Sequence, residues 1–137
     1  MDRLVKDNKR INFHIPFTMD KEFLDRHRNV LFIFGDNGRH FGKGGAAKLR
    51  DRPNSIGFVT KKYPSNEDSS FFTLNDYPEV FEEEKKRLLK IIKDNPNRWI
   101  LISRLGGGLA NRYGIFEHII GPWLESLEQY KNVILLY

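Results

Sequence analysis

The sequence of residues 100–113 is ILISRLGGGLANRY. The apolar residues 99–102 predict a buried strand, the glycines at 106–108 predict a tight turn, and the amphipathic pattern that begins near Tyr113 predicts a helix. This order can hold a phosphate group, because glycines let the backbone approach an anion and the free N–H groups of a helix start donate to it. A tight strand-to-helix connection would explain the same glycines. The stretch therefore predicts a strand–turn–helix unit and leaves both interpretations of its turn open.

A second unit of the same kind lies earlier in the chain. Residues 30–34 (VLFIF) are five consecutive apolar residues, which is typical of a parallel strand covered on both faces. Asp36 and Asn37 follow, and then a glycine-rich loop leads into a short helix predicted at residues 46–50. In a parallel sheet both glycine loops would lie at the carboxyl edge, where open α/β folds bind ligands. Asp36 and Asn37 either contact a sugar or base there or form an ordinary Asp-Asn-Gly turn.

The rest of the chain continues the alternation of strands and helices. We expect a single domain over residues 1–137, in which residues 1–28 are a variable N-terminal segment. The alternation predicts the α/β class, with a mostly parallel, mixed sheet in a three-layer α/β/α sandwich. The charged run at residues 82–87 is interpreted as a solvated helix face. The remaining predicted strands are 11–17 (an edge strand), 55–60 and 133–136, and the remaining helices are 19–28 with Thr18 as N-cap, from Asn75 or Asp76 to about 93, and 113–129 with a break at Gly121-Pro122.

Composition narrows the class of protein further. The hydrophobic fraction of 39% and the 11 Phe argue against disorder. No apolar run approaches the roughly 18 residues of a membrane helix, and no signal peptide precedes the first strand. We therefore expect a cytoplasmic protein without a membrane partner. The chain has no Cys and its His residues lack ligand spacing, so we expect no metal and no cofactor.

The charge distribution points to an anionic partner. The net charge is +5, but residues 1–62 carry +7 and residues 63–137 carry −2. Arg104 and Arg112 flank the glycine turn, where they could pair with phosphate oxygens. Two further interpretations stay open. One is a nucleic-acid binder that uses Phe41 and Tyr63 for stacking, and the other is an ordinary solvated basic surface.

Four motifs, taken in order, resemble those of the macrodomains. They are the strand end at Asn37, the loop GKGGAA at 42–47, the strand end TKK at 60–62, and the turn RLGGGL at 104–109. The resemblance covers residues 29–137. It is closest to the subgroup that contains the terminal ADP-ribose glycohydrolase and the antitoxins that strip ADP-ribose from DNA.

This resemblance implies an α/β/α domain that binds ADP-ribose or a related nucleotide diphosphate in a cleft at the carboxyl edge. Asp36 and Asn37 would lie by the distal ribose, residues 42–45 around that ribose and its phosphate, and residues 106–110 along the diphosphate. Tyr113 would close over the ligand. The binding residues that the resemblance predicts are Asp36, Asn37, Gly42, Lys43, Gly44, Gly45, Arg104, Gly106, Gly107, Gly108, Leu109, Ala110, Asn111, Arg112 and Tyr113.

The resemblance also implies a catalytic residue. In the hydrolytic subgroup a lysine at the position of Lys61 attacks the ribose anomeric carbon, and an aspartate after the glycine turn assists. This chain keeps Lys61 but has Ala110 at the position of the aspartate, so Asp36 or Glu117 would have to replace it. An ADP-ribosyl hydrolase acting on modified protein or nucleic acid and a non-catalytic scavenger of a nucleotide-derived signal are both consistent with the sequence. Residues 1–28 lack the Gly-Asp pair that contacts adenine in the family, which predicts altered adenine recognition.

Overall fold

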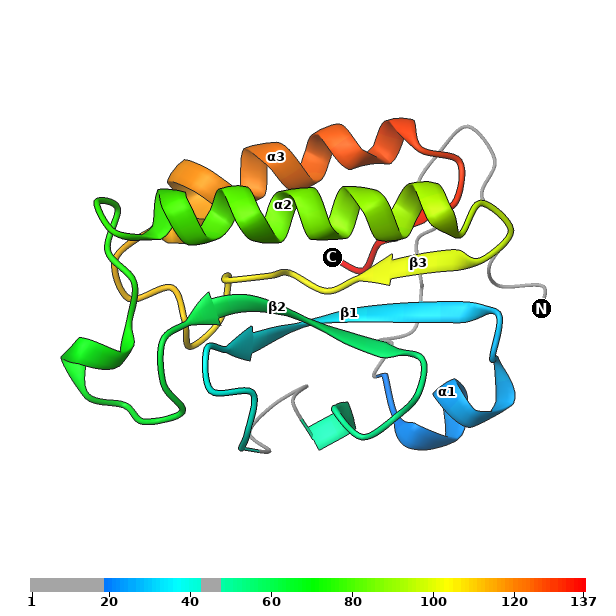
Figure 1. Cartoon of the computed structure of the whole chain (residues 1–137), viewed down its shortest axis with the longest axis horizontal. Helices are drawn as coiled ribbons and strands as arrows, with labels where there is room; N and C mark the ends of the chain where they lie inside the picture. The colour runs from blue at the N-terminus through cyan, green and yellow to red at the C-terminus, as the bar shows by residue number, and fades with distance from the viewer. Residues whose placement is uncertain (1–18, 43–47) are drawn as a thin grey trace.

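A four-stranded parallel sheet forms the centre of the computed structural model, which describes residues 19–42 and 48–137 (Figure 1). Its strands lie in the order β2-β1-β3-β4, and every neighbouring pair is parallel. The α/β class is confirmed. The mixed character that we expected is absent from the described strands, and the predicted edge strand 11–17 lies outside the described residues. The strands are β1 (Val30–Asn37), β2 (Ser55–Lys61), β3 (Trp99–Ile102) and β4 (Val133–Leu135).

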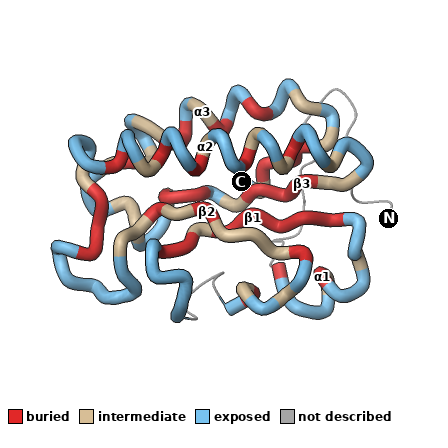
Figure 2. The backbone as a smooth tube through the Cα atoms, in the orientation of Figure 1, coloured by how far each residue is buried: buried red, intermediate tan, exposed pale blue. Residues whose placement is uncertain are grey.

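Helices cover both sides of this sheet, with α2 and α3 on one side and α1 on the other (Figure 1). Side chains of β1 alternate between the two layers, as the period of a strand requires. Leu31 and Ile33 pack with α2 and α3, whereas Phe32 and Phe34 pack with Leu24 of α1. Buried residues accordingly follow the strands in Figure 2. The helices are α1 (Lys21–Arg26), α2 (Tyr77–Asp94), α3 (Gly121–Ser126), a π-helix η4 (Phe116–Ile120), and the 3₁₀ helices η3 (Asp68–Ser70) and η5 (Leu127–Gln129).

Two predicted helix starts need correction. Asp20 is the N-cap of α1, since its carboxylate accepts from the Phe23 N–H at 2.8 Å. The expected cap Thr18 lies outside the described residues. Asp76 does precede α2 and Pro78 lies in its first turn, as predicted, but the Asp76 side chain makes no capping bond to the helix. Of the helix expected at 46–50, residues 48 and 49 form part of a 3₁₀ turn and residues 46–47 lie outside the described range.

The C-terminal helical segment breaks where the sequence predicted. Pro122 has no N–H to donate, and the Gly121 N–H donates to the Phe116 carbonyl, five residues back. This spacing gives the π-helix η4, which α3 follows directly. The segment begins at Phe116 rather than near Tyr113. The Phe116 N–H donates to the side chain of Asn111, which precedes the helical segment. No helix in residues 19–42 and 48–137 combines the length and apolar composition that crossing a membrane requires.

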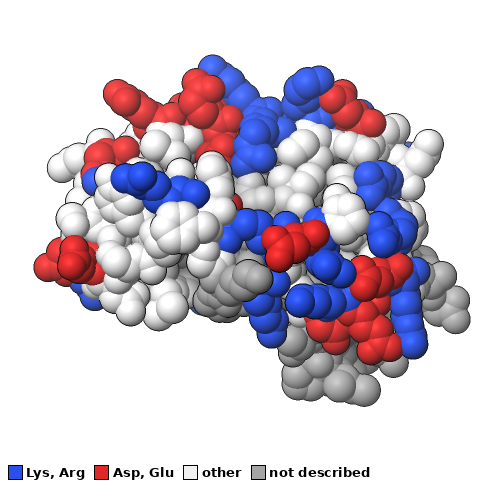
Figure 3. Space-filling model, turned by 60° about the horizontal axis from the view of Figure 1, so that its bottom comes forward, with Lys and Arg blue, Asp and Glu red and all other residues white. Residues whose placement is uncertain are grey.

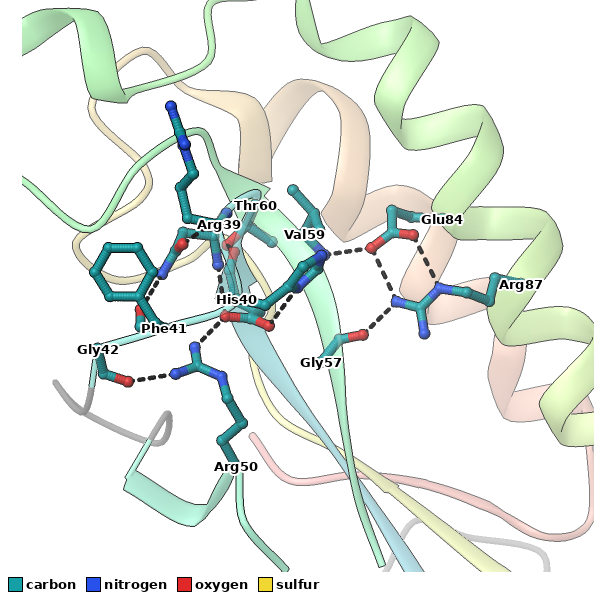
Figure 4. A network of polar contacts seen from close by, with 12 residues as sticks. Arg39, His40, Phe41, Gly42, Arg50, Gly57, Val59, Thr60, Glu84 and Arg87 are labelled. Atoms are coloured by element: carbon teal, nitrogen blue, oxygen red, sulfur yellow. Dashed lines mark hydrogen bonds and ion pairs between the residues drawn. The ribbon is translucent and has the colours of Figure 1, made fainter.

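Side chains of α2 cover the outer edge of β2. The Val59 N–H donates to Glu84 at 2.6 Å, and Arg87 donates to the Gly57 carbonyl (Figure 4). The Tyr77 hydroxyl donates to the Val59 carbonyl at 2.7 Å. Glu84 is only 8% exposed, so the interpretation of its charged run as a fully solvated face was wrong at this residue. These bonds occupy backbone groups that would otherwise be free to pair with another chain.

We predict that Glu84→Ala lowers the free energy of unfolding by about 1–3 kcal/mol, because it leaves the partly buried Val59 N–H without an acceptor. Glu84→Gln keeps an acceptor oxygen and should cost less. Urea denaturation measures both effects, with the exposed neighbour changed in Glu83→Ala as the matched control. Equal losses in Glu84→Ala and Glu83→Ala would contradict this account.

Candidate functional site

The carboxyl edge of the sheet brings together three loops that are far apart in the sequence. The strands β1, β2 and β3 are parallel neighbours, so the loops after them leave at the same edge. The edge is stepped: β3 ends with Ile102 paired to Ile33, whereas β1 and β2 continue to the pair Asn37 and Lys61. Both predicted glycine turns therefore begin at this edge.

The Asp36 carboxylate is held by its own protein. It is 6% exposed and forms an ion pair with Arg50. Its oxygens also accept from the Asn37 N–H at 2.8 Å and from His40 Nδ1 at 3.1 Å. His40 adopts a left-handed backbone conformation, with φ of 57°, that side chains rarely take. Asp36 thus anchors the loop after β1 and has little carboxylate surface left for a ligand.

Asn37 shapes the same loop. Its amide donates to the Phe41 carbonyl at 2.7 Å and accepts from the Arg39 N–H at 2.9 Å. Of the two interpretations that the sequence left open, turn chemistry is the one that these bonds display. Gly42 follows with φ of +97°, and its carbonyl accepts from Arg50 (Figure 4). Lys43, Gly44 and Gly45 lie outside the described residues.

Lys61 and Arg112 come together on one aromatic ring. Lys61 Nζ lies 4.8 Å and Arg112 Cζ 4.4 Å from the centroid of Phe71. Phe71 is 4% exposed, so its ring is a fixed part of the core rather than a mobile side chain. Arg112 forms an ion pair with Asp68, whereas Lys61 has no ion pair within the described part of the chain. We call Lys61, Phe71 and Arg112 the carboxyl-edge triad.

The surroundings of Lys61 disfavour its charged form. Partial burial lowers the pKa of the Lys61 amine, and the positive charge of Arg112 lowers it further. A lower pKa increases the fraction of neutral amine at a given pH, and only the neutral amine is a nucleophile. The charged form of the Lys61 amine is therefore less favoured than that of a lysine in water.

The glycine turn after β3 is partly structural and partly open. Gly106 is buried with φ of +76°, and a Cβ there would lie 2.6 Å from Ile120 Cδ1. Gly108, in contrast, faces open space, and Leu109 is 83% exposed. The fold thus requires glycine at 106, while residues 108 and 109 are exposed and the Gly108 carbonyl accepts from the Asn111 N–H at 3.0 Å. Ala110 lies at intermediate depth after them.

The predicted residues beside this turn take structural contacts. Arg104 stacks on the ring of Phe116, with its Cζ 4.4 Å from the ring centroid, rather than on the ring of the triad. Asn111 accepts from the Phe116 N–H at 3.1 Å and donates to the Glu117 carboxylate at 2.8 Å, so it caps η4. Two hydrogen bonds lower the pKa of the Glu117 carboxyl. The larger effect comes from its own backbone N–H and the smaller from the Asn111 side chain. Tyr113 is half-exposed near the start of η4.

Basic and aromatic side chains also meet on the outer part of the edge. Arg39 lies over the ring of Tyr63 at 5.0 Å, and Tyr63 and Phe41 are 42% and 58% exposed. Lys62 lies 5.5 Å from the Phe72 ring and pairs with Asp76. On the face of the molecule that Figure 3 shows, Lys and Arg are interspersed with Asp and Glu rather than gathered into one basic tract. Among residues 19–42 and 48–137, no group of three His, Asp or Glu could hold a metal ion.

Sequence reasoning missed Phe71 and its neighbour Asp68. Phe71 and Phe72 form an apolar pair that ends an otherwise polar loop, and this pair was the available signal. An apolar pair in a loop indicates burial, but not which cations cover it. The contact of Lys61 and Arg112 with the same Phe71 ring therefore depends on tertiary structure that the local sequence does not encode.

The fold and the triad define an α/β protein with a parallel sheet that carries Lys61 and Arg112 at its carboxyl edge. Residues 16–111 match a family of unknown function, DUF7831, and this match spans more than half of the chain. The protein therefore belongs to the DUF7831 family. No curated protein and no solved structure matches the chain significantly. The matched segment includes β1, β2, β3, Lys61 and the glycine turn, whereas Arg112 follows its last residue.

Proposed function

We propose that the protein is a macrodomain-like module that binds ADP-ribose or a related nucleotide diphosphate at the carboxyl edge. The observation that carries the proposal is the position of Lys61. Its amine has no ion pair within the described residues and lies beside Arg112, at the edge where both glycine turns begin. An unpaired amine can attack a ribose anomeric carbon as a nucleophile. Cations and free N–H groups bind a diphosphate.

The proposed ligand lies across this edge with its two halves on different loops. Its diphosphate follows the exposed residues 108 and 109 to Ala110, with Arg112 at the end of that path. Its distal ribose faces Lys61. The loop that Asp36 and Asn37 hold in place borders the ribose, and these two side chains act by shaping the loop rather than by direct contact.

Hydrolysis of an ADP-ribosyl linkage is the reaction that this arrangement would support. The neutral Lys61 amine attacks the anomeric carbon, the bond to the carrier breaks, and the carrier leaves with the electron pair and a proton. Water then attacks the same carbon, releasing ADP-ribose and restoring Lys61. Ala110 provides no carboxylate for these steps, and Asp36 and Glu117 are already engaged by Arg50 and Asn111.

Titration calorimetry with ADP-ribose tests the binding. We expect saturable heat and a matching rise in thermal stability, since ligand at about 100 times its Kd stabilises the folded state by about 2.7 kcal/mol. Adenosine monophosphate, which lacks the diphosphate and the distal ribose, is the matched ligand control and should bind more weakly. Absence of heat and of a thermal shift at millimolar ADP-ribose would overturn the proposal.

The exposed rings of Phe41 and Tyr63 beside Arg39 favour a second candidate, a single-stranded nucleic-acid binder. The same titration series distinguishes it, with a labelled single-stranded oligonucleotide in place of ADP-ribose. Binding that is present at low salt and weakens steeply as salt increases would support this candidate. Indifference to the oligonucleotide at low salt would exclude it.

A further inference from the structure

The geometry points to Arg112 as a positioning residue for Lys61, because the two side chains share the ring of Phe71 and the guanidinium opposes a second positive charge on the amine. The inference rests on the proposed function only for its catalytic meaning. Its structural basis is the pair of distances from the Phe71 centroid, 4.8 Å to Lys61 Nζ and 4.4 Å to Arg112 Cζ. Arg112 touches no reacting atom in this arrangement and acts through Lys61.

The ring and the guanidinium have opposite electrostatic effects on the amine. An aromatic face attracts a cation, so Phe71 holds the end of the Lys61 side chain in place. Arg112 is charged at all accessible pH values and repels a second charge on the same ring. Burial, the larger cause, and this repulsion together lower the pKa of the Lys61 amine. The amine is thus fixed in position and biased toward its neutral form.

Other charged groups near the triad do not cancel this effect. On the loop after β2, Asp68 pairs with Arg112 at the exposed surface, and Lys62 pairs with Asp76. On the neighbouring strand β1, the Asp36 carboxylate is paired with Arg50. No carboxylate of the described residues pairs with Lys61 itself, so the charge that acts on its amine is that of Arg112, which Asp68 offsets only in part.

Labelling with an amine-reactive ester across a pH series measures the effect without any substrate. The neutral amine reacts, so the rate at each lysine, read by mass spectrometry, reports its protonation. Lys90 is an internal reference, because its ion pair with Asp94 raises the pKa of its amine. We expect Lys61 to reach half-maximal labelling at a lower pH than Lys90.

Arg112→Gln should slow the labelling of Lys61 about threefold or more near pH 8, which corresponds to about half a pH unit. Arg112→Lys restores a positive charge on the ring and should recover most of the wild-type profile. Asp68→Asn removes the anion that faces Arg112 and should move the profile in the opposite direction, to lower pH. Arg26→Gln, on α1, is the matched control and should leave the profile unchanged.

An unchanged Lys61 profile in both Arg112→Gln and Asp68→Asn would overturn the inference. Asp68 is an exposed side chain, so its replacement tests the electrostatic argument even if Arg112→Gln folds poorly. Circular dichroism at each pH establishes that the labelled variants are folded. Labelling needs no ADP-ribose, so the result stays readable if calorimetry rejects the proposed function, and failure here leaves nucleotide binding intact.

Discussion

Lys61→Ala should reduce the release of ADP-ribose from an ADP-ribosylated protein or DNA by about 10³-fold or more, while ADP-ribose still binds. Loss of a nucleophile that forms a covalent intermediate typically has an effect of this order, because no neighbouring group repeats its chemistry. Within the described residues, Lys61 is the lysine on the Phe71 ring. Removing its amine takes away the attacking atom but leaves the backbone of residues 108–110, which we expect to hold the diphosphate.

Product analysis by chromatography measures the release, and calorimetry measures the binding of the same preparations. Lys90→Ala is the matched control, since it removes an exposed lysine amine of α2 that pairs with Asp94 and not with the triad. Release by Lys61→Ala at the wild-type rate would show that Lys61 is not the nucleophile. A wild-type protein that binds ADP-ribose tightly and releases none would identify a scavenger instead of an enzyme.

The parts of the fold that the sequence predicted well are those set by hydrophobic burial. The apolar residues 30–34 and 99–102 became the adjacent central strands β1 and β3, because a run without polar alternation can only be satisfied by cover on both faces. The change from η4 to α3 at Gly121-Pro122 could also be predicted from the sequence, since proline lacks the N–H donor that a regular helix needs. These features depend on local residue type, which a single sequence displays.

Features that depend on side chains meeting across the fold were not predicted. Glu84 was interpreted with its charged neighbours, although it lies three residues after Phe81 and four before Leu88, on the apolar face of α2. That spacing was a usable signal for burial. Its acceptor role toward Val59 was not, because it requires knowing which strand edge α2 covers.

The same distinction applies to the candidate site. Parallel neighbouring strands place the starts of the loops after β1 and β3 at one edge, and alternation of strands and helices was enough to predict that. The local sequence does not show that Asp36 pairs with Arg50 or that the Asn37 side chain bonds to the loop backbone. Nor does it reveal that a loop phenylalanine joins Lys61 to Arg112. The roles that the macrodomain resemblance predicts for these residues stay predictions, whereas the contacts between them are visible only in the folded structure.

Asp36→Ala should lower the free energy of unfolding by about 3–5 kcal/mol, because it breaks a buried ion pair and leaves Arg50 largely buried without its partner. The loop after β1 should loosen as well, since the Asn37 N–H and His40 lose the same acceptor. Asp36→Asn keeps one acceptor oxygen and should cost less. Urea denaturation measures both losses, and a loss below about 1 kcal/mol in Asp36→Ala would contradict the role of Asp36 as the anchor of this loop.

A double-mutant cycle with Gly57 tests whether Asp36 is as rigidly held as these contacts imply. A Cβ at Gly57 would lie 2.6 Å from Asp36 Oδ2 and 2.9 Å from its Cβ. Gly57→Ala alone should therefore cost about 1–3 kcal/mol from overpacking, since Arg50 and His40 prevent the carboxylate from moving aside. With Asp36→Ala in place the contacts with the carboxylate are gone and only the 2.9 Å contact with Cβ remains, so adding Gly57→Ala should cost less than it does in the wild type. Additive losses would mean that the Asp36 side chain moves freely, because only a fixed neighbour makes the two changes interact.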